Sequence, residues 1–278
     1  MKIELINTGS ELLLGRVLNT HQQWIGRRLA DRGYELTCQV AVPDTADAIQ
    51  RAVEEALGRS DLVITTGGLG PTSDDRTREL IAEMLNRPLR EDAAIVRHIE
   101  SFFQGRGRTM PQSVRVQAMV PEGARVIAND FGTAPGLAMT VAGESAFNGR
   151  AHLVMLPGPP RELRPMFDAR VLPWLEAEVF APVEFACRTL RSTGIGESRV
   201  EEKIKERLPS LFERGLEIGY CARTGEVDVR LIARGSGAAE LVDEAVDGLL
   251  TLFRGAIYGQ DDDVLEEILV RTLSGSVL

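Results

Sequence analysis

The stretch "DLVITTGGLGPTSDDRTRELI", residues 61–81, decides the fold. Its segment "LVITT" is short and apolar or β-favouring, which is typical of a strand buried on both faces of a parallel sheet. Three glycines and a proline end this strand, two adjacent aspartates follow, and "DRTRELIAEMLN" predicts a helix. In an open parallel sheet, ligands bind where such a loop joins a strand end to a helix start. The loop is therefore the first candidate ligand site.

The glycines of this loop suit a phosphate group. They let backbone N–H groups approach an anion closely, and the dipole of the following helix favours negative charge. The loop is neither a Walker loop, since no GKS or GKT follows, nor a GxGxxG motif, so glycine alone is a weak signal. The candidate substrate-binding residues here are Thr66, Gly67, Gly68, Gly70, Pro71 and Thr72.

Two carboxylates, Asp74 and Asp75, stand beside these glycines. They would repel a phosphate unless a divalent cation lay between them, and Mg²⁺ prefers one or two carboxylates together with phosphate oxygens and water. A structural alternative is a capping box between Thr72 and Asp75, which contributes about 0.5–2 kcal/mol to a helix start. Asp74 and Asp75 are therefore candidate metal ligands, with Mg²⁺, Mn²⁺ or Co²⁺ as the expected cofactor.

Two other strand ends have the same design. The predicted strand "IELINTG" ends in Gly9, and Ser10 and Glu11 come after it, while Asp44 follows the predicted strand "LTCQVAV". Gly9 and Ser10 are candidate substrate-binding residues. The structural alternatives are a turn and an ordinary helix N-cap. Because the carboxyl ends of parallel strands lie at one edge of a sheet, we expect the carboxylates of three successive strand ends to lie along that edge.

Two loops rich in glycine and proline complete the candidate site. They are "GTAPG" at 132–136 and "LPGPPREL" at 156–163, and both also suit a tight turn followed by a regular element. Four arginines are candidate phosphate partners, although each also suits a solvated surface: Arg76, Arg78, Arg115 and Arg161. The candidate substrate-binding residues in the two loops are Gly132, Thr133, Pro135, Gly136 and Gly158.

The order of predicted elements indicates two domains. Residues 1–170 alternate strands and helices, which predicts an α/β domain with a parallel sheet covered on both faces, and 126–156 add three further strands. A long helix then closes the unit, with a break expected at Pro173. Residues 171–258 include a β-α-β-β-α order with a hairpin around Thr224 and Gly225, which predicts a small α+β domain. Residues 259–278 read as a linker toward a further domain.

Composition limits the classes of partner and metal site that the protein could have. The 278 residues carry a net charge of −9, which argues against nucleic acid or an anionic membrane as a partner held by bulk electrostatics. The three cysteines have no CxxC spacing and the three histidines are scattered, so any metal would be held by oxygen. Neither a signal peptide nor an apolar run of ~20 residues is visible, so we expect a cytoplasmic protein.

Taken together, the motifs closely resemble the competence/damage-inducible protein family, CinA. The resemblance covers essentially the whole chain and rests on "TGSELLLG", "TTGGLGPTSDD", "GTAPG", "LPGPPREL", "GIGES" and "GEVDVRL" in this order. The first domain also resembles the molybdopterin-binding fold of the MogA/MoaB group. The resemblance implies a three-layer α/β sandwich with a mostly parallel sheet, then a small α+β KH-like domain, in a homodimer. Longer relatives carry a C-terminal nicotinamide-nucleotide amidase domain; the 278 residues end where that domain would begin, so we do not expect deamidation from them.

The resemblance also implies a divalent-metal-dependent pyrophosphatase that converts ADP-ribose to AMP and ribose 5-phosphate. In that mechanism the TGG loop holds the diphosphate, and Asp75 with Asp44 or Asp74 positions the metal and an attacking water. Glu11 is the candidate base or second metal anchor, predicted from its position at a strand end. The chain departs from the family pattern at Val116, where the family has a lysine that would meet a phosphate.

Two other functions stay open. A pterin-binding protein that transfers an adenylyl group, of the molybdenum-cofactor type, would use the same fold, because function belongs to the site and not to the fold. A non-catalytic nucleotide sensor is the other alternative, and Val116 is the residue that favours it. The KH-like domain is not expected to bind RNA, because "STGIGES" is not a GXXG loop with flanking basic residues.

Overall fold

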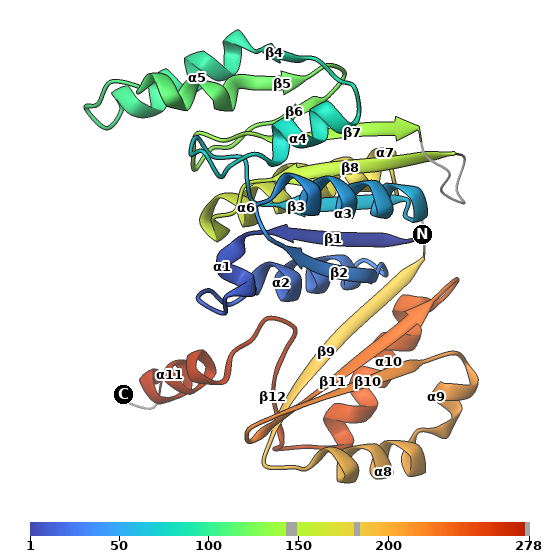
Figure 1. Cartoon of the computed structure of the whole chain (residues 1–278). Helices are drawn as coiled ribbons and strands as arrows, with labels where there is room; N and C mark the ends of the chain where they lie inside the picture. The colour runs from blue at the N-terminus through green and yellow to red at the C-terminus, as the bar shows by residue number, and fades with distance from the viewer. Residues whose placement is uncertain (143–148, 181–183, 276–278) are drawn as a thin grey trace. The chain divides into compact units, whose positions relative to one another are not determined.

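The computed structural model describes residues 1–142, 149–180 and 184–275, which form two compact units (Figure 1). The first unit comprises Met1–Leu29 with Tyr34–Ala181, and the second comprises Ala30–Gly33 with Pro182–Leu278. The predicted boundary at 170/171 is therefore too early. Val171, Leu172 and Leu175 belong to the buried core of the first unit, so the helix that contains them cannot be divided from it.

A six-stranded sheet with the order β2-β1-β3-β8-β7-β6 forms the first unit. Four of these strands are parallel, namely β2, β1, β3 and β8, while β7 and β6 run antiparallel to their neighbours. The parallel part was expected, and the antiparallel extension is new. The strands are β1 (Ile3–Thr8), β2 (Leu36–Val42), β3 (Leu62–Thr66), β6 (Arg125–Ile127), β7 (Gly136–Ala142) and β8 (Arg150–Leu156).

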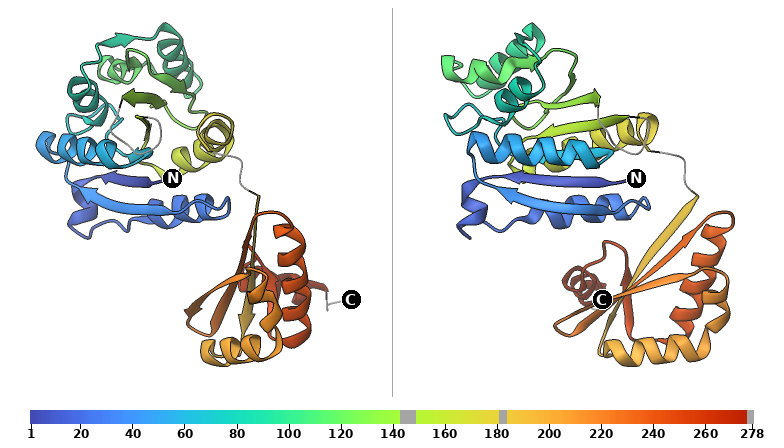
Figure 2. Two further views of the ribbon diagram at one scale, coloured as in Figure 1. Left: turned by 90° about the vertical axis from the view of Figure 1, so that its right-hand side faces the viewer. Right: turned by 45° about the vertical axis from the view of Figure 1, so that its right-hand side comes forward.

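Helices cover both faces of this sheet, as the predicted three-layer fold requires (Figure 2). One face packs against α2 and the closing helices α6 and α7, and the other packs against α3 and α4. The helices of this unit are α1 (Ser10–Leu13), α2 (Thr20–Ala30), α3 (Ala46–Arg59), α4 (Thr77–Met84), α5 (Ala93–Gln104), α6 (Pro160–Met166) and α7 (Leu172–Glu178).

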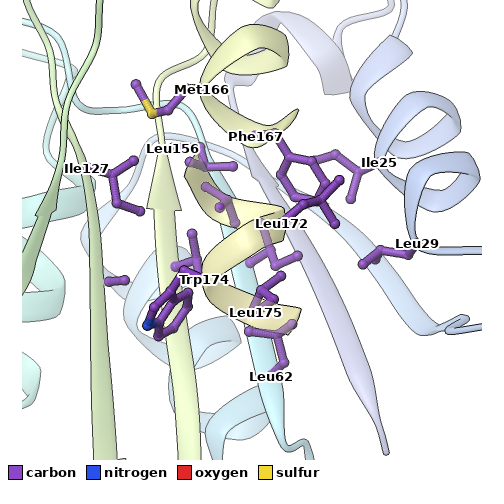
Figure 3. Close-up of a cluster of buried hydrophobic side chains, with 14 of the residues drawn as sticks. Ile25, Leu29, Leu62, Ile127, Leu156, Met166, Phe167, Leu172, Trp174 and Leu175 are labelled. Atoms are coloured by element: carbon purple, nitrogen blue, oxygen red, sulfur yellow. The ribbon is translucent and has the colours of Figure 1, made fainter. Parts of the chain in front are cut away.

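Aliphatic and aromatic side chains fill the layer between the sheet and α2, α6 and α7 (Figure 3). Leu62 and Leu156 come from the central strands, and the rings of Phe167 and Trp24 pack edge to face with centroids 5.6 Å apart. The closing helix is irregular at Phe167–Val171, a π-helical segment, and Pro173 occupies the first turn of α7. The expected break is thus a π-turn just before the proline, because the proline ring removes one backbone donor.

A side lobe extends the first unit beyond α4. It contains the short antiparallel pair β4 (Leu89–Glu91) and β5 (Met119–Pro121), together with α5 and the 3-10 helix η1 (Gln112–Ala118). Asp92 caps α5 by accepting hydrogen bonds from the N–H groups of Ala94 (2.7 Å) and Ile95 (3.2 Å). Buried side chains of α5 and η1 pack together, and the partly buried Val126 of β6 packs against them.

The second unit has an antiparallel sheet with the order β10-β11-β9-β12 and its own hydrophobic core. The hairpin expected at Thr224 and Gly225 joins β10 to β11, where Arg223 pairs with Glu226. Its elements are β9 (Phe185–Thr193), α8 (Glu197–Arg207), α9 (Pro209–Glu213), β10 (Glu217–Arg223), β11 (Glu226–Arg234), α10 (Ala238–Leu252), β12 (Ile257–Gln260) and α11 (Leu265–Gly275). Within the described residues, no helix is both long and apolar enough to cross a membrane.

Candidate functional site

A cleft of about 500 Å³ lies at the carboxyl ends of β1, β2, β3 and β8, and it is named here the strand-end cleft. It brings together most of the residues predicted from the sequence. Those that line it are Gly9, Glu11, Asp44, Gly67, Gly68, Gly70, Pro71, Asp74, Asp75, Thr133 and Gly158. The lining residues that sequence reasoning missed are Thr8, Leu69, Gln117, Ala134, Pro157, Pro159 and Glu162.

Buried polar side chains hold the ends of β1 and β3 in place below the cleft. Asn7 is fully buried, and its amide donates to the Thr66 hydroxyl at 2.7 Å. The amide oxygen of Asn7 accepts hydrogen bonds from Asn19 and Gln39, each at 2.9 Å. Because a buried amide is costly unless it is hydrogen-bonded, this network fixes the position at which each strand ends.

The glycine pair after β3 is required by close approach. Gly67 has φ +99°, and a Cβ there would lie 2.6 Å from the carbonyl oxygen of Thr8. Gly68 has φ +67°, and a Cβ there would lie 2.0 Å from the Thr77 hydroxyl. Both positions favour glycine because an L side chain is strained at positive φ.

Three successive backbone N–H groups, beginning with that of Gly68, are open. The N–H groups of Gly68, Leu69 and Gly70 make no hydrogen bond to any residue that the structure describes, whereas that of Gly67 donates to Leu156. Consecutive N–H groups in a loop with positive φ form a concavity that binds anions. The glycine loop therefore has the backbone chemistry that its sequence predicted.

Asp75 is held by Thr72 and not by a helix cap. Its carboxylate accepts from the Thr72 N–H at 3.0 Å and from the Thr72 hydroxyl. The helix α4 begins at Thr77, so the Thr72–Asp75 pair, which was the structural alternative to a metal site, forms before the helix and does not cap it. Hydrogen bonding to Thr72 also lowers the pKa of the neighbouring Asp74. Asp74 and Asp75 both line the cleft as carboxylates.

Asp44 connects two strand ends across the cleft. Its carboxylate accepts from the N–H of Ser10 at 2.8 Å, and its own N–H donates to the Ser10 hydroxyl at 3.3 Å. The residue before α3 is Thr45, so Asp44 does not act as the N-cap that its position suggested. Ser10 lies just outside the cleft wall and acts by holding Asp44.

Glu11 folds back over Gly9 at the start of α1. A Cβ at Gly9 would lie 2.5 Å from a carboxylate oxygen of Glu11, so only glycine leaves room for this conformation. Glu11 is exposed and lines the cleft. An exposed carboxylate that faces a ligand cleft can accept a proton from water there.

Glu162 is a buried carboxylate that sequence reasoning missed. It is 8% exposed, and it accepts from the Asn129 amide at 2.8 Å. A Cβ at Gly132 would lie 2.0 Å from the same carboxylate, so Gly132 serves the cleft by making room for Glu162. The only signal in the sequence was its place in the "LPGPPREL" loop, where an acidic residue in the first turn of a helix is common.

Six predicted binding residues do not line the cleft. Besides Ser10 and Gly132, Thr66 is bonded to Asn7, and Thr72 is bonded to Asp75. Gly136 begins β7 and packs under Met166. Pro135 faces a neighbouring pocket of about 240 Å³. Four of these six, namely Ser10, Thr66, Thr72 and Gly132, position residues that touch the cleft or its floor.

The cleft is acidic. Five carboxylates line it, and none of the described lining residues is a lysine or an arginine. The four arginines suggested as phosphate partners are not among these residues. Arg78 is buried beside Glu79, and burial lowers its pKa, while Arg115 makes a bidentate pair with Glu91. Val116 does not line the cleft either. Among the residues described, no three side chains of histidine, cysteine, aspartate or glutamate gather as a preformed metal site.

Comparison with known proteins agrees with this architecture. Residues 4–177 match the family described as "Probable molybdopterin binding domain", and residues 187–259 match the "Damage-inducible protein CinA KH domain". The fold and cleft thus define a molybdopterin-binding-type α/β domain joined to a KH-type domain. The chain belongs to the CinA-like family of competence/damage-inducible proteins.

Relatives of known sequence extend along the whole chain. A putative competence-damage inducible protein of Symbiobacterium thermophilum is 41% identical over 278 residues, which are 99% of this chain and 63% of that protein. A CinA-like protein of Dictyoglomus turgidum is 39% identical over 277 residues, 98% of this chain and 64% of that protein. The chain therefore spans less than two thirds of these relatives.

A solved structure is similar to part of the chain. The CinA protein of unknown function from Thermoplasma acidophilum is 34% identical, with a TM-score of 0.54, over 64% of this chain and 98% of that one.

Proposed function

We propose that this chain is a divalent-metal-dependent pyrophosphatase that hydrolyses ADP-ribose, or a related nucleoside-diphosphate sugar, to AMP and ribose 5-phosphate. One observation carries the proposal. Gly68, Leu69 and Gly70, whose backbone N–H groups make no hydrogen bond to a described residue, line a cleft that has five carboxylates and, among its described residues, no basic side chain. Such a cleft accepts a diphosphate only together with a cation, because the carboxylates alone would repel it.

The residues present fit a divalent cation. In Asp44 and in Asp75 one carboxylate oxygen is used within the protein, and the other makes no hydrogen bond to a described residue. Mg²⁺ commonly takes one or two carboxylates and fills its remaining positions with phosphate oxygens and water, so a preformed cage is unnecessary. When bound, such a cation neutralises phosphate charge and makes a bound water more acidic.

The protein's own residues then do the positioning. The N–H groups of Gly68, Leu69 and Gly70 hold phosphate oxygens by hydrogen bonds. Thr72 keeps Asp75 oriented, and Ser10 does the same for Asp44. Glu11 accepts a proton from water as the water oxygen attacks phosphorus, the bridging P–O bond breaks, and the leaving phosphate takes the electron pair. The products are AMP and ribose 5-phosphate.

The second candidate function is pterin binding with adenylyl transfer. The observation that favours it is the family match over residues 4–177, whose description names molybdopterin. The carboxylate-lined cleft and the fused second unit do not depend on a pterin, so this function is placed second. Titration with a nucleotide-activated pterin separates the two functions. A nucleotide sensor without turnover would bind ADP-ribose and release no AMP in any metal.

The deciding experiment is AMP release from ADP-ribose by the purified chain with Mg²⁺, Mn²⁺ or Co²⁺, beside Asp75→Asn and Glu11→Gln. We expect metal-dependent release that falls about 100-fold or more in Asp75→Asn, because the variant loses an anionic ligand at the cleft. Glu11→Gln should fall by a similar factor if Glu11 is the base. Full activity of Glu11→Gln would remove that role.

The matched control is Asp47→Asn, which changes an exposed aspartate of α3 whose partner is Arg51 and which lies outside the cleft. This variant should retain full activity. No release in any metal, with ADP-ribose still bound, would replace the hydrolase by a sensor.

A further inference from the structure

The side chain of Gln117 is buried in the wall of the strand-end cleft with one polar atom unused. Gln117 lies in η1, is 2% exposed and lines the cleft. Its amide oxygen Oε1 has no hydrogen-bond partner among the described residues. A buried amide oxygen without a partner is unfavourable, so this atom is poised to accept a hydrogen bond from a ligand.

The orientation of this amide follows from its neighbour. The amide nitrogen Nε2 donates to the carbonyl oxygen of Leu69 at 3.4 Å. A flipped amide would place two oxygens against each other at this point, so Oε1 must be the atom that faces away from Leu69. The open group on Gln117 is thus an acceptor, and it selects a donor.

The segment that carries Gln117 is held rigidly. Arg115 makes two hydrogen bonds to Glu91, at 2.6 and 2.7 Å, and the N–H of Asp92 donates to the carbonyl of Ala118 at 2.9 Å. Val114 is buried in the core of the side lobe. A group fixed in this way before a ligand arrives costs little ordering entropy on binding.

The cleft that Gln117 lines has apolar residues besides its carboxylates. They are Leu69, Pro71, Ala134 and Pro157. Apolar walls with one oriented polar group are typical of the part of a site that recognises a ring or a sugar.

We propose that Gln117 is a specificity-determining residue, whose Oε1 accepts a hydrogen bond from an N–H or O–H donor on the base or sugar of the bound nucleotide. This inference rests on the proposed function, because it takes the ligand to be a nucleoside-diphosphate sugar. The donor is either the exocyclic amine of the base or a ribose hydroxyl, and both present the same hydrogen-bond chemistry to Oε1.

The test is calorimetric binding of ADP-ribose, AMP, IMP and 2′-deoxy-AMP, with Mg²⁺, to the whole chain and to Gln117→Met. Methionine keeps the length of the side chain and removes the acceptor. We expect ADP-ribose and AMP to bind about tenfold more weakly to Gln117→Met. Gln112→Met is the matched control, since Gln112 is an exposed glutamine of the same 3-10 helix, and it should bind as the wild type does.

The ligand series identifies the donor. If the base amine is the donor, the wild type should prefer AMP to IMP by about tenfold and Gln117→Met should lose this preference. If the 2′-hydroxyl is the donor, the same pattern should hold for AMP against 2′-deoxy-AMP. Equal binding of ADP-ribose and AMP by the wild type and Gln117→Met overturns the inference.

The two proposals fail differently. Tight binding that depends on Gln117, with no release of AMP in any metal, would remove the hydrolase and leave the recognition role intact. Metal-dependent hydrolysis that Gln117→Met carries out with unchanged KM and kcat would remove the recognition role and leave the hydrolase intact. Absence of binding to any of the four probes would overturn both.

Discussion

Glycine residues give the strand-end cleft its shape because carboxylates rest directly against their Cα atoms. A Cβ at Gly70 would lie 2.2 Å from a carboxylate oxygen of Asp75, and the corresponding distance from Gly132 to Glu162 is 2.0 Å. In both cases the neighbouring group is the end of a side chain, which is able to move. The glycine is therefore needed less for the fold than for the position of the carboxylate.

This contact gives a sharp prediction for Gly70→Ala. The backbone of Gly70 does not lie at positive φ, so alanine is tolerated, and the methyl group must push the Asp75 carboxylate aside. We expect AMP release to fall by about 10²-fold, since a 1 Å misplacement of a reacting group has that effect, while the melting temperature changes little. Activity assay and thermal unfolding of the same preparation measure both.

Gly58→Ala is the control. Gly58 lies in α3, where a Cβ meets no atom within 4 Å, so this variant should keep full activity and gain a little stability. A Gly70→Ala enzyme with wild-type activity would show that the position of Asp75 is unimportant.

At the scale of elements, an ion pair with a buried carboxylate joins β1 to the C-terminal end of α3. Glu4 of β1 is 3% exposed, and it accepts from Arg59 at 2.7 and 2.8 Å and from the Ser60 hydroxyl at 2.6 Å. Burial raises the pKa of Glu4, but the hydrogen bonds and the charge of Arg59 outweigh it, so the pKa is lowered overall. The charged carboxylate is therefore favoured in the folded state.

Arg59→Met should destabilise the first unit by about 1–3 kcal/mol at pH 7, because it leaves a buried carboxylate with only partial compensation while keeping the aliphatic stem. This loss of stability is smaller than for a fully buried pair, because the guanidinium of Arg59 is half exposed and solvent screens its charge. A lowered folded pKa contributes stability above the unfolded value of about 4.3, and this stability is lost as the pH falls through the folded pKa. The difference between wild type and variant should therefore be full above about pH 5 and shrink below it.

Urea unfolding followed at several pH values measures this difference. Arg51→Met is the control, because the Arg51–Asp47 pair has both side chains largely exposed and should be worth less than about 0.5 kcal/mol. A pH-independent loss of stability in Arg59→Met would mean that packing of the arginine stem, and not the ion pair, is responsible.

Element patterns predicted most of the first unit, and the reasons for the misses are physical. Strands β1, β2 and β3 and the helices that follow them have clear apolar periodicity, so the sequence located them. The direction of β7 and β6 has no periodic signal, which is why the antiparallel extension was not predicted. Helix-cap alternatives arose for Asp44 and Thr72 because both residues suit a cap locally, and only the folded chain supplies their partners Ser10 and Asp75.

The sequence predicted only those parts of the cleft whose residues lie close together in the chain. The TGG loop and its aspartates form one continuous motif, so their place at a strand end could be inferred. Glu162 and Gln117 reach the cleft from segments remote from that motif, and each looks like an ordinary polar residue of a helix. Long-range packing decides their use, and a single sequence does not contain that information.

At the scale of the whole molecule, the two units have separate cores. The hydrophobic clusters of the α/β unit and of the antiparallel unit have no residue in common. Every residue that lines the strand-end cleft lies between Thr8 and Glu162, within the first unit. A domain with its own core is in principle able to fold alone.

We therefore expect a chain of residues 1–181 to fold and to retain AMP release within about threefold of the whole chain. Circular dichroism and the activity assay test this, with the Asp75→Asn change in the short chain as the negative control. A folded but inactive short chain would show that the second unit or an oligomer that it supports takes part in the reaction.

On the proposed function, the acidity of the cleft makes its two ligands mutually dependent. Five carboxylates repel a diphosphate and attract a cation, so neither binding event is independent of the other. Linkage requires that a bound cation raises the affinity for nucleotide by the same factor by which bound nucleotide raises the affinity for the cation. The fraction of protein with both ligands bound then follows the product of the free nucleotide and free cation concentrations. At a constant nucleotide concentration, the free magnesium concentration of the cell would set the fraction of active protein.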